Sequence, residues 1–198
     1  MDPPLDSLLV GGPGDGGYYL PEKQIAHCSK VCSPGVGEVI NFEIDLMKKG
    51  LIAYCADGNI SSLPSIPEEL KSGLYFTNKN IGLLDDDNTI FFHKWINESI
   101  KENEKYILQM DVEGFEHVVL PKFIESNLQL PQILVLEIHG AHFLFRQDYI
   151  GALHRHVLDV IFEKYEVYYH QINSLAGFVR TKHINLPKAI EITFILRS

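Results

Sequence analysis

The segment YILQMDVEGFEHVVL, residues 106–120, decides the fold class. Its first part is a short apolar run, which is typical of a strand buried in a sheet, and its last part has apolar residues at helical spacing. An acidic turn, residues 111–114, joins the two. A strand that ends at a carboxylate and continues into a helix is a recurring unit of open α/β sheets, whose ligands bind at the carboxyl ends of the strands. Asp111 therefore either faces a ligand or caps the helix. In the second case, Glu113 and Glu116 would interact favourably with the positive end of the helix dipole.

The composition indicates one globular domain and excludes several classes of partner. The chain has 198 residues and 45% apolar content, which is enough for a substantial core. A net charge of −9 argues against nucleic acid as a partner, because phosphate binding needs clustered Lys and Arg. No apolar run approaches the roughly 20 residues of a membrane span, and the N-terminus lacks the pattern of a signal peptide. Cys28, Cys32 and Cys55 form no CxxC pair, so we expect reduced cysteines, no zinc site and a cytoplasmic protein.

A second strand–turn–helix unit covers residues 26–50. A short strand within residues 26–33 is followed by the turn Pro34-Gly35-Val36-Gly37, and Gly50 ends the helix. Glycines in such a turn let the backbone approach a ligand at the helix N-terminus. Ile40 stands where a dinucleotide fingerprint has its third glycine and no Walker lysine follows, which counts against NAD and a P-loop. The helix should turn one side inward, formed by Val39, Ile40, Glu43, Leu46 and Met47.

The next strand, residues 51–56, ends at Asp57. Asp57 follows Gly37 at the spacing at which an acid can accept hydrogen bonds from ribose hydroxyls. The alternative is an ordinary turn formed by Asp57 and Gly58. The glycine turn and the spacing together favour ribose binding.

The remaining segments extend the α/β pattern. We expect strands at 74–77, 133–138 and 166–170, a loop at 78–82, an exposed acidic turn at 85–87, helices at 89–104 and 150–165, and an antiparallel strand at 190–196. The continuous apolar run 133–138 predicts a parallel sheet covered on both faces. If this strand pairs with residues 106–110, Glu137 and His139 lie beside Asp111, and His170 and Asn173 end the strand at 166–170. The two helices should bury Ile90, Phe91, Trp95, Ile96 and Ile100, and Leu153, Val157, Val160 and Ile161.

The motifs occur in one order: DGGYYLP, SPGVGEVINFE, the acid at Asp57, MDVEGFEHVVL, VLEIHG and LPKAIEITFIL. From about Gly11 to the end they resemble the FkbM-like S-adenosylmethionine-dependent methyltransferases. The resemblance implies the class I methyltransferase fold, a Rossmann-like three-layer sandwich with a mostly parallel seven-stranded sheet and an antiparallel C-terminal strand. It implies a single domain over residues 1–198, in which residues 1–24 form a glycine-rich lid or leader.

The resemblance also implies a cofactor, a reaction and a site. The cofactor is S-adenosyl-L-methionine, and the methyl group goes to an oxygen of a sugar or small metabolite. Asp111 would face the amino group or sulfonium and the acceptor. The sequence departs from the family where Cys32 and Ser33 replace an acid before the glycine turn. The implied cofactor residues are Ser33, Gly35 and Gly37 at the methionine part, Asp57 with Gly58 at the ribose, and residues 80–83, including Gly82, near the adenine.

An oxygen acceptor needs a base. His139, with an ordinary pKa of about 6.5, suits that role. Asp111 is a poorer base, at about 3.9, unless burial or Glu113 raises its pKa. We expect Asp111 to orient the acceptor and His139 or His170 to take the proton. No metal is assigned, although Asp111, Glu113 and Glu137 would suit a hard cation.

Two other functions remain open on the sequence. One is a methyltransferase-fold module that binds a cofactor or partner without chemistry, and the other is an NAD-dependent oxidoreductase. For an enzyme, we expect a small-molecule or saccharide acceptor and neither nucleic acid nor membrane.

Overall fold

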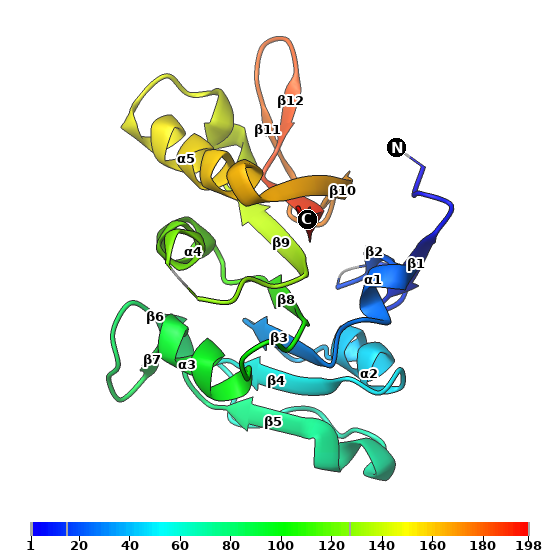
Figure 1. The fold of residues 1–198 in the computed structure, drawn as a ribbon. Helices are drawn as coiled ribbons and strands as arrows, with labels where there is room; N and C mark the ends of the chain where they lie inside the picture. Colours follow the sequence, from blue (N-terminus) through cyan, green and yellow to red (C-terminus); the bar gives the residue numbers. More distant parts are fainter. Residues whose placement is uncertain (1, 15, 127, 198) are drawn as a thin grey trace.

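The centre of the molecule is a seven-stranded sheet. The computed structural model describes residues 2–14, 16–126 and 128–197, and its main sheet has the strand order β10-β13-β9-β8-β3-β4-β5 (Figure 1). β13 runs antiparallel to both of its neighbours, β9 and β10, and the other neighbouring pairs of this sheet are parallel. This confirms the α/β class and the sheet predicted from the sequence. The strands are β3 (Lys30–Pro34), β4 (Ile52–Ala56), β5 (Leu74–Thr77), β8 (Tyr106–Met110), β9 (Ile133–His139), β10 (Tyr165–Ile172) and β13 (Ala189–Leu196).

Helices cover both faces of this sheet. On one face lie α3 (Phe92–Ser99), α4 (Glu116–Glu125) and α5 (Tyr149–Lys164), and on the other lie α1 (Glu22–Ile25) and α2 (Asn41–Met47) (Figure 1). Each face has its own buried cluster. Leu108 and Leu134 contribute to the first, while Ile107 and Ile133 contribute to the second. Alternate residues of β8 and β9 thus enter opposite clusters, which explains why their sequences are continuously apolar.

Three expectations about the helices are wrong in detail. Val39 precedes α2 and is 63% exposed, and Leu153 of α5 is 37% exposed. The helix predicted over residues 89–104 covers only α3, because Thr89–Phe91 forms β7. The β-branched and aromatic residues of β7 favour a strand. It pairs in parallel with β6 (Asn80–Gly82), inside the segment predicted to be a loop.

The acidic turn between β6 and β7 is confirmed. Asp85, Asp86 and Asp87 are exposed. Asp86 Oδ1 accepts hydrogen bonds from the backbone N–H groups of Asn88 and Thr89, and Asp85 binds Lys94 at 2.8 Å. The carboxylates thus shape the turn and its link to α3.

The N-terminal segment expected to be a lid or leader contains an antiparallel hairpin. Its strands are β1 (Ser7–Val10) and β2 (Tyr18–Pro21), and Met1 and Asp15 of this segment lie outside the described residues. The Gly11 N–H donates to Asp45 Oδ2 of α2 at 3.1 Å, and the Tyr18 ring packs edge-on against Phe42, with centroids 5.5 Å apart. The hairpin is therefore packed against α2.

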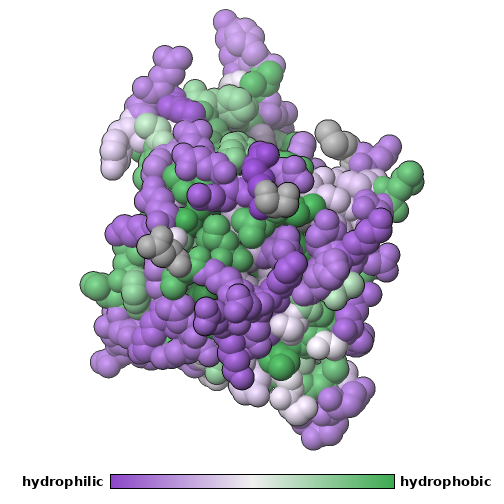
Figure 2. All heavy atoms as spheres, viewed as in Figure 1, coloured by the Kyte–Doolittle hydropathy of each residue, from purple (hydrophilic) through white to green (hydrophobic). Residues whose placement is uncertain are grey.

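The remaining elements lie outside the main sheet. They are the 3-10 helices η1 (Glu68–Gly73) and η2 (Ala141–Phe145) and the hairpin of β11 (Phe178–Arg180) and β12 (Asn185–Pro187). Hydrophilic side chains cover most of the face drawn in Figure 2, with apolar side chains between them near its centre. Within the described part of the chain, no helix has the length and apolar character needed to cross a bilayer.

Candidate active site

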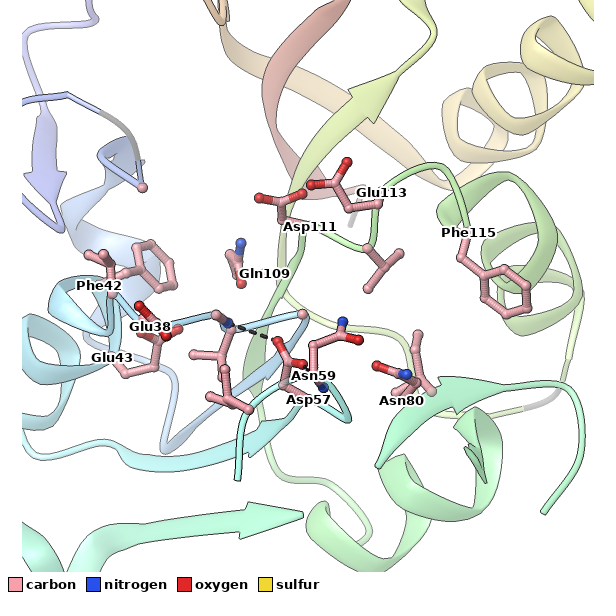
Figure 3. Close-up of a pocket in the computed structure, with 18 of the residues that line it drawn as sticks. Glu38, Phe42, Glu43, Asp57, Asn59, Asn80, Gln109, Asp111, Glu113 and Phe115 are labelled. Atoms are coloured by element: carbon pink, nitrogen blue, oxygen red, sulfur yellow. Dashed lines mark hydrogen bonds between the residues drawn. The ribbon is translucent and has the colours of Figure 1, made fainter. Parts of the chain in front are cut away.

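A cavity of about 700 Å³ opens at the carboxyl ends of β3, β4 and β8 (Figure 3). Its size lies within the usual range for small-molecule and cofactor sites. The strand–turn–helix pattern of the sequence predicts ligands at this edge of the sheet. The walls include Gly35 and Gly37 after β3, Asp57 and Asn59 after β4, Asn80 and Ile81 of β6, Gln109, Asp111 and Glu113 at the end of β8, and Tyr18 of the hairpin.

The glycine turn touches the acidic turn directly. Gly35 has φ +77°, and a Cβ built on it would lie 1.7 Å from the Asp111 carbonyl oxygen. Gly37 has φ +60°, but no atom lies within 4 Å of its Cβ position. The two glycines therefore differ in function. Gly35 allows two loops to meet, whereas Gly37 gives the backbone a left-handed conformation beside the cavity.

Asp57 connects the ends of β3 and β4. It is 5% exposed, and its Oδ2 accepts a hydrogen bond from Gly37 N–H at 3.0 Å. Its Oδ1 accepts from Asn59 N–H at 2.7 Å. The carboxylate thus organises the two loops and lines the cavity, and its binding to a ribose stays a prediction.

Three predicted cofactor residues do not line the cavity. Ser33 is fully buried. Gly58 donates its N–H to Asn80 Oδ1 at 3.0 Å, and a Cβ on it would lie 2.7 Å from Asn80 Nδ2. A Cβ on Gly82 would lie 2.2 Å from Thr89 Cγ2. Close packing accounts for both of these glycines.

Glu116 ties the acidic turn to the end of β9. The turn includes two left-handed residues, Glu113 with φ +53° and Gly114 with φ +98°. Glu116 Oε2 accepts from Gly114 N–H at 2.9 Å, and its Oε1 accepts from His139 N–H at 2.8 Å. Although burial opposes ionisation, the bonds with His139 hold the pKa of Glu116 below its ordinary value. Phe115 is the N-cap of α4 and no side chain caps it, so Asp111 does not cap this helix.

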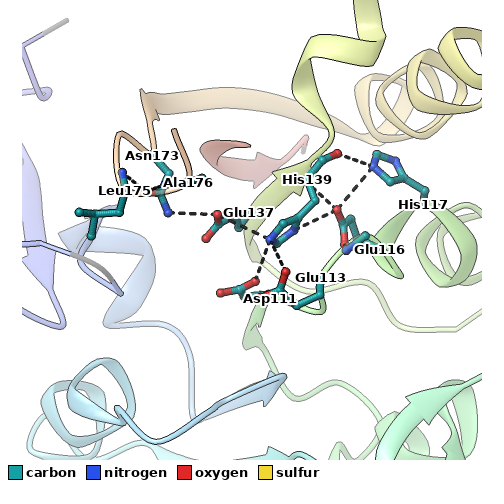
Figure 4. Close-up of polar contacts among 10 residues, drawn as sticks. Asp111, Glu113, Glu116, His117, Glu137, His139, Asn173, Leu175 and Ala176 are labelled. Atoms are coloured by element: carbon teal, nitrogen blue, oxygen red, sulfur yellow. Dashed lines mark hydrogen bonds and ion pairs between the residues drawn. The ribbon is translucent and has the colours of Figure 1, made fainter. Parts of the chain in front are cut away.

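His139 lies among four carboxylates (Figure 4). Its Nδ1 is 3.4 Å from Glu116 Oε1, while its Nε2 is 3.6 Å from Asp111 Oδ1, 3.4 Å from Glu113 Oε2 and 3.7 Å from Glu137 Oε1. The pairing of β8 with β9 brings Glu137 and His139 beside Asp111, as predicted.

The carboxylates change the protonation of the whole cluster. Burial alone would lower the pKa of His139, but Glu116 and then the charges of Asp111 and Glu137 raise it to about 9. His139 is therefore a cation at neutral pH. Burial and the charge of Asp111 raise the pKa of Glu137 to about 7, although Asn173 Nδ2 donates to Glu137 Oε1 at 3.0 Å. His170, the other candidate base, is exposed on β10 and does not line the cavity.

The cluster also contains three side chains that could each give one ligand atom to a metal ion: Asp111, Glu137 and His139. These carboxylate oxygens and the imidazole nitrogen lie within 4.8 Å of one another. Carboxylates and a neutral imidazole can bind divalent metals. A metal would have to displace the proton of His139, so the set fits a metal only after that proton leaves. That this site holds no metal stays a prediction.

Gln109 and Tyr18 line the cavity, although the sequence pattern did not single out either residue for the site. Gln109 is the penultimate residue of β8, where strand alternation could have indicated a side chain near Asp111. Tyr18 reaches the site because the hairpin folds over α2. Burial, then the charges of Glu191 and Asp111, raise the pKa of its phenol well above the ordinary value, so it is neutral.

The charge on His139 can be tested by titration. We expect the imidazole of the wild-type protein to titrate near pH 9 by NMR, and Glu116→Gln to lower this midpoint towards the ordinary value, because the buried anion next to Nδ1 is removed. Glu113→Gln is the matched control. Its side chain is 89% exposed, so water screens its charge and the midpoint should barely move. Equal shifts in both variants would contradict this account.

Comparison with known proteins supports the fold. No family model and no curated protein matches the chain. Among solved structures, one described as "cmcI-D160 Mg-SAM" matches with a TM-score of 0.51 and 12% identity, over 90% of this chain and 71% of that one. A fibrillarin/Nop5p complex has a TM-score of 0.49 and 12% identity (85% and 73% covered). An O-methyltransferase from Bacillus cereus in complex with SAH has 0.48 and 10% (87% and 76%).

The strand order of the sheet and the cavity at the carboxyl ends of its strands define the fold class. The chain has the fold of the class I S-adenosylmethionine-dependent methyltransferases. The narrower resemblance to the FkbM-like group stays a prediction.

Proposed function

We propose that the protein transfers a methyl group from S-adenosyl-L-methionine to a hydroxyl oxygen of a sugar or small metabolite. One observation carries the proposal. The glycine turn, Asp57 and Asp111 end the adjacent strands β3, β4 and β8 and border one cavity. The FkbM-like motifs and the bound SAM named for a structure with this fold agree with the proposal.

The cavity suits the shape and charge of this cofactor. Asp57 would accept hydrogen bonds from the ribose hydroxyls, and Asn80 and Ile81 would border the adenine. Gly37 leaves room for the methionine part beside the turn. The acidic residues of the wall favour a cationic cofactor over its neutral-sulfur product, which would assist product release.

Catalysis would depend mainly on alignment. When bound, the cofactor supplies a methyl group on a sulfonium. With the cofactor held at the glycine turn and Asp57, a base of this chain would take the proton of the acceptor hydroxyl, and the oxygen would accept the methyl group while the sulfur keeps the electron pair of its bond to carbon. We propose that Asp111 orients the acceptor, with Glu113 beside it at the rim, since holding reactants in line can supply much of the rate enhancement.

The base should be visible in the pH profile of turnover. If His139 takes the proton, it must first lose its own, so turnover should rise with pH up to about 9. The measurement is the initial rate from pH 6 to 10 with an acceptor from a panel of sugars and hydroxylated metabolites. His139→Ala should abolish the rise, whereas the exposed His170→Ala should not. A plateau from about pH 7 would assign the base to Glu137 instead.

Calorimetry tests the proposal against the two alternative functions. A methyltransferase should bind S-adenosylhomocysteine and release no heat with NAD. Binding of NAD but not of S-adenosylhomocysteine would support an oxidoreductase. Tight cofactor binding without turnover across the acceptor panel would support a binding module. The protonated state of His139 at neutral pH favours that alternative, because a protonated imidazole cannot act as the base.

We propose a small-molecule or saccharide acceptor and a cytoplasmic location. The three free, buried cysteines suit the latter.

A further inference from the structure

Glu43 is a buried carboxyl group in the wall of the cavity. It lies in α2, is 2% exposed and borders the same space as Asp57 and Asp111. Its position on the inward side of α2 agrees with the helical spacing of the sequence. Glu43 has no role in the proposed catalysis.

No protein cation balances this group. Among residues 2–14, 16–126 and 128–197, no Lys, Arg or His side chain lies within 4.0 Å of the Glu43 carboxyl. Ser33, fully buried at the end of β3, is its polar neighbour and favours the ionised form. Burial outweighs this effect and raises the pKa of Glu43 to about 7. An ionised carboxylate in such a place is costly unless a cation pairs with it.

The position along the cavity indicates which cation would reach it. Figure 3 shows Asn80, Asp57 and Glu43 in sequence across the view, with Asp111 on another side of the space. If the adenine lies at Asn80 and the ribose at Asp57, the methionine part extends towards α2. That part carries an ammonium group, whereas the adenosyl part is uncharged.

We propose that the Glu43 carboxylate, supported by Ser33, binds the α-ammonium group of the methionine part of the cofactor. This inference rests on the proposed function. It makes Glu43 a binding residue that recognises the amino-acid end of the ligand and not its nucleoside.

The test compares three ligands in one variant. Glu43→Gln keeps the size and hydrogen-bonding capacity of the side chain but removes its charge. S-adenosylmethionine and S-adenosylhomocysteine both carry the ammonium group, and 5′-methylthioadenosine lacks it. We expect the variant to bind the first two about ten- to 150-fold more weakly, the range of a hydrogen bond to a charged group, and the third unchanged.

Each other outcome overturns the assignment. Loss for S-adenosylmethionine alone would mean that Glu43 faces the sulfonium. Equal loss for all three ligands, or no loss, would make its role structural, and thermal unfolding of the variant checks that the fold is kept. Glu38→Gln is the charge-matched control, because Glu38 is exposed at the same cavity. An equal loss in that variant would make the effect one of general charge. If the wild-type protein binds none of the ligands, the proposed function itself fails.

The pH dependence of binding is a second readout. Because an ammonium partner stabilises the ionised carboxylate, affinity of the wild-type protein for S-adenosylhomocysteine should rise as pH increases through about 7. Glu43→Gln should lose that rise, and its persistence would contradict the proposal. The elements packed on α2 include β1, β3, β4 and η1, and also β2 through Tyr18. β4 presents Cys55 and β2 presents Tyr18, and burial raises the pKa of both groups, so both are neutral near pH 7. β3 presents Ser33, β1 has no titratable group, and the charges of η1, Glu68, Glu69 and Lys71, are exposed.

Discussion

Gly35→Ala should lower the free energy of unfolding by about 3 kcal/mol. A left-handed conformation costs a non-glycine residue roughly 1–2 kcal/mol, and inserting a methyl group into a closed contact adds about 1–3 kcal/mol. At Gly35 the new methyl group would meet the Asp111 carbonyl oxygen, so relief requires one of the two turns to move. Because those turns border the cavity, the variant should also lose affinity for S-adenosylhomocysteine. Urea unfolding and calorimetry measure the two effects.

Gly37→Ala is the matched control. Its backbone is also left-handed but its Cβ position is open, so its cost should be only the conformational part, about 1–2 kcal/mol. A Gly35→Ala variant no less stable than Gly37→Ala would show that the contact between the two turns is not tight.

Asp57→Ala should weaken binding of S-adenosylhomocysteine by about 1.5–3 kcal/mol, roughly ten- to 150-fold, the range for hydrogen bonds to a charged group. Without the carboxylate, the ribose hydroxyls and the backbone N–H groups of Gly37 and Asn59 would all lose their hydrogen-bond acceptor. Calorimetry measures the affinity.

Asp57→Asn separates the two losses. The amide keeps one oxygen to accept from the backbone, so the turn should persist while part of the ribose interaction is lost. Thermal unfolding reports on the turn. Unchanged affinity in the folded Asp57→Ala variant would remove Asp57 from the ribose site.

The sheet was predictable because its strands carry local signals. Residues 133–138 are continuously apolar, and a strand covered on both faces requires that pattern. β7 was missed because Thr89–Phe91 runs directly into α3, and its pairing with β6 depends on residues earlier in the chain. Val39 was misplaced because the helix begins only after Ile40.

The site was predictable only where strand order determines it. Asp111 and His139 end neighbouring strands, so the sheet alone brings them together. The charge of His139 depends on Glu116 and Glu137, which approach through tertiary packing, and its ordinary pKa of about 6.5 gave a wrong protonation state at neutral pH. Tyr18 likewise reaches the cavity through the fold of the hairpin on α2.

The central claim is that the ends of β3, β4 and β8 hold one adenosyl-bearing ligand, and a crystal structure with S-adenosylhomocysteine tests it most directly. The account predicts the ribose hydroxyls at the Asp57 carboxylate, the adenine near Asn80 and the sulfur on the side of Gln109 and Asp111. Ligand density at any other place on the protein, or a cavity without ligand at saturating concentration, would contradict it.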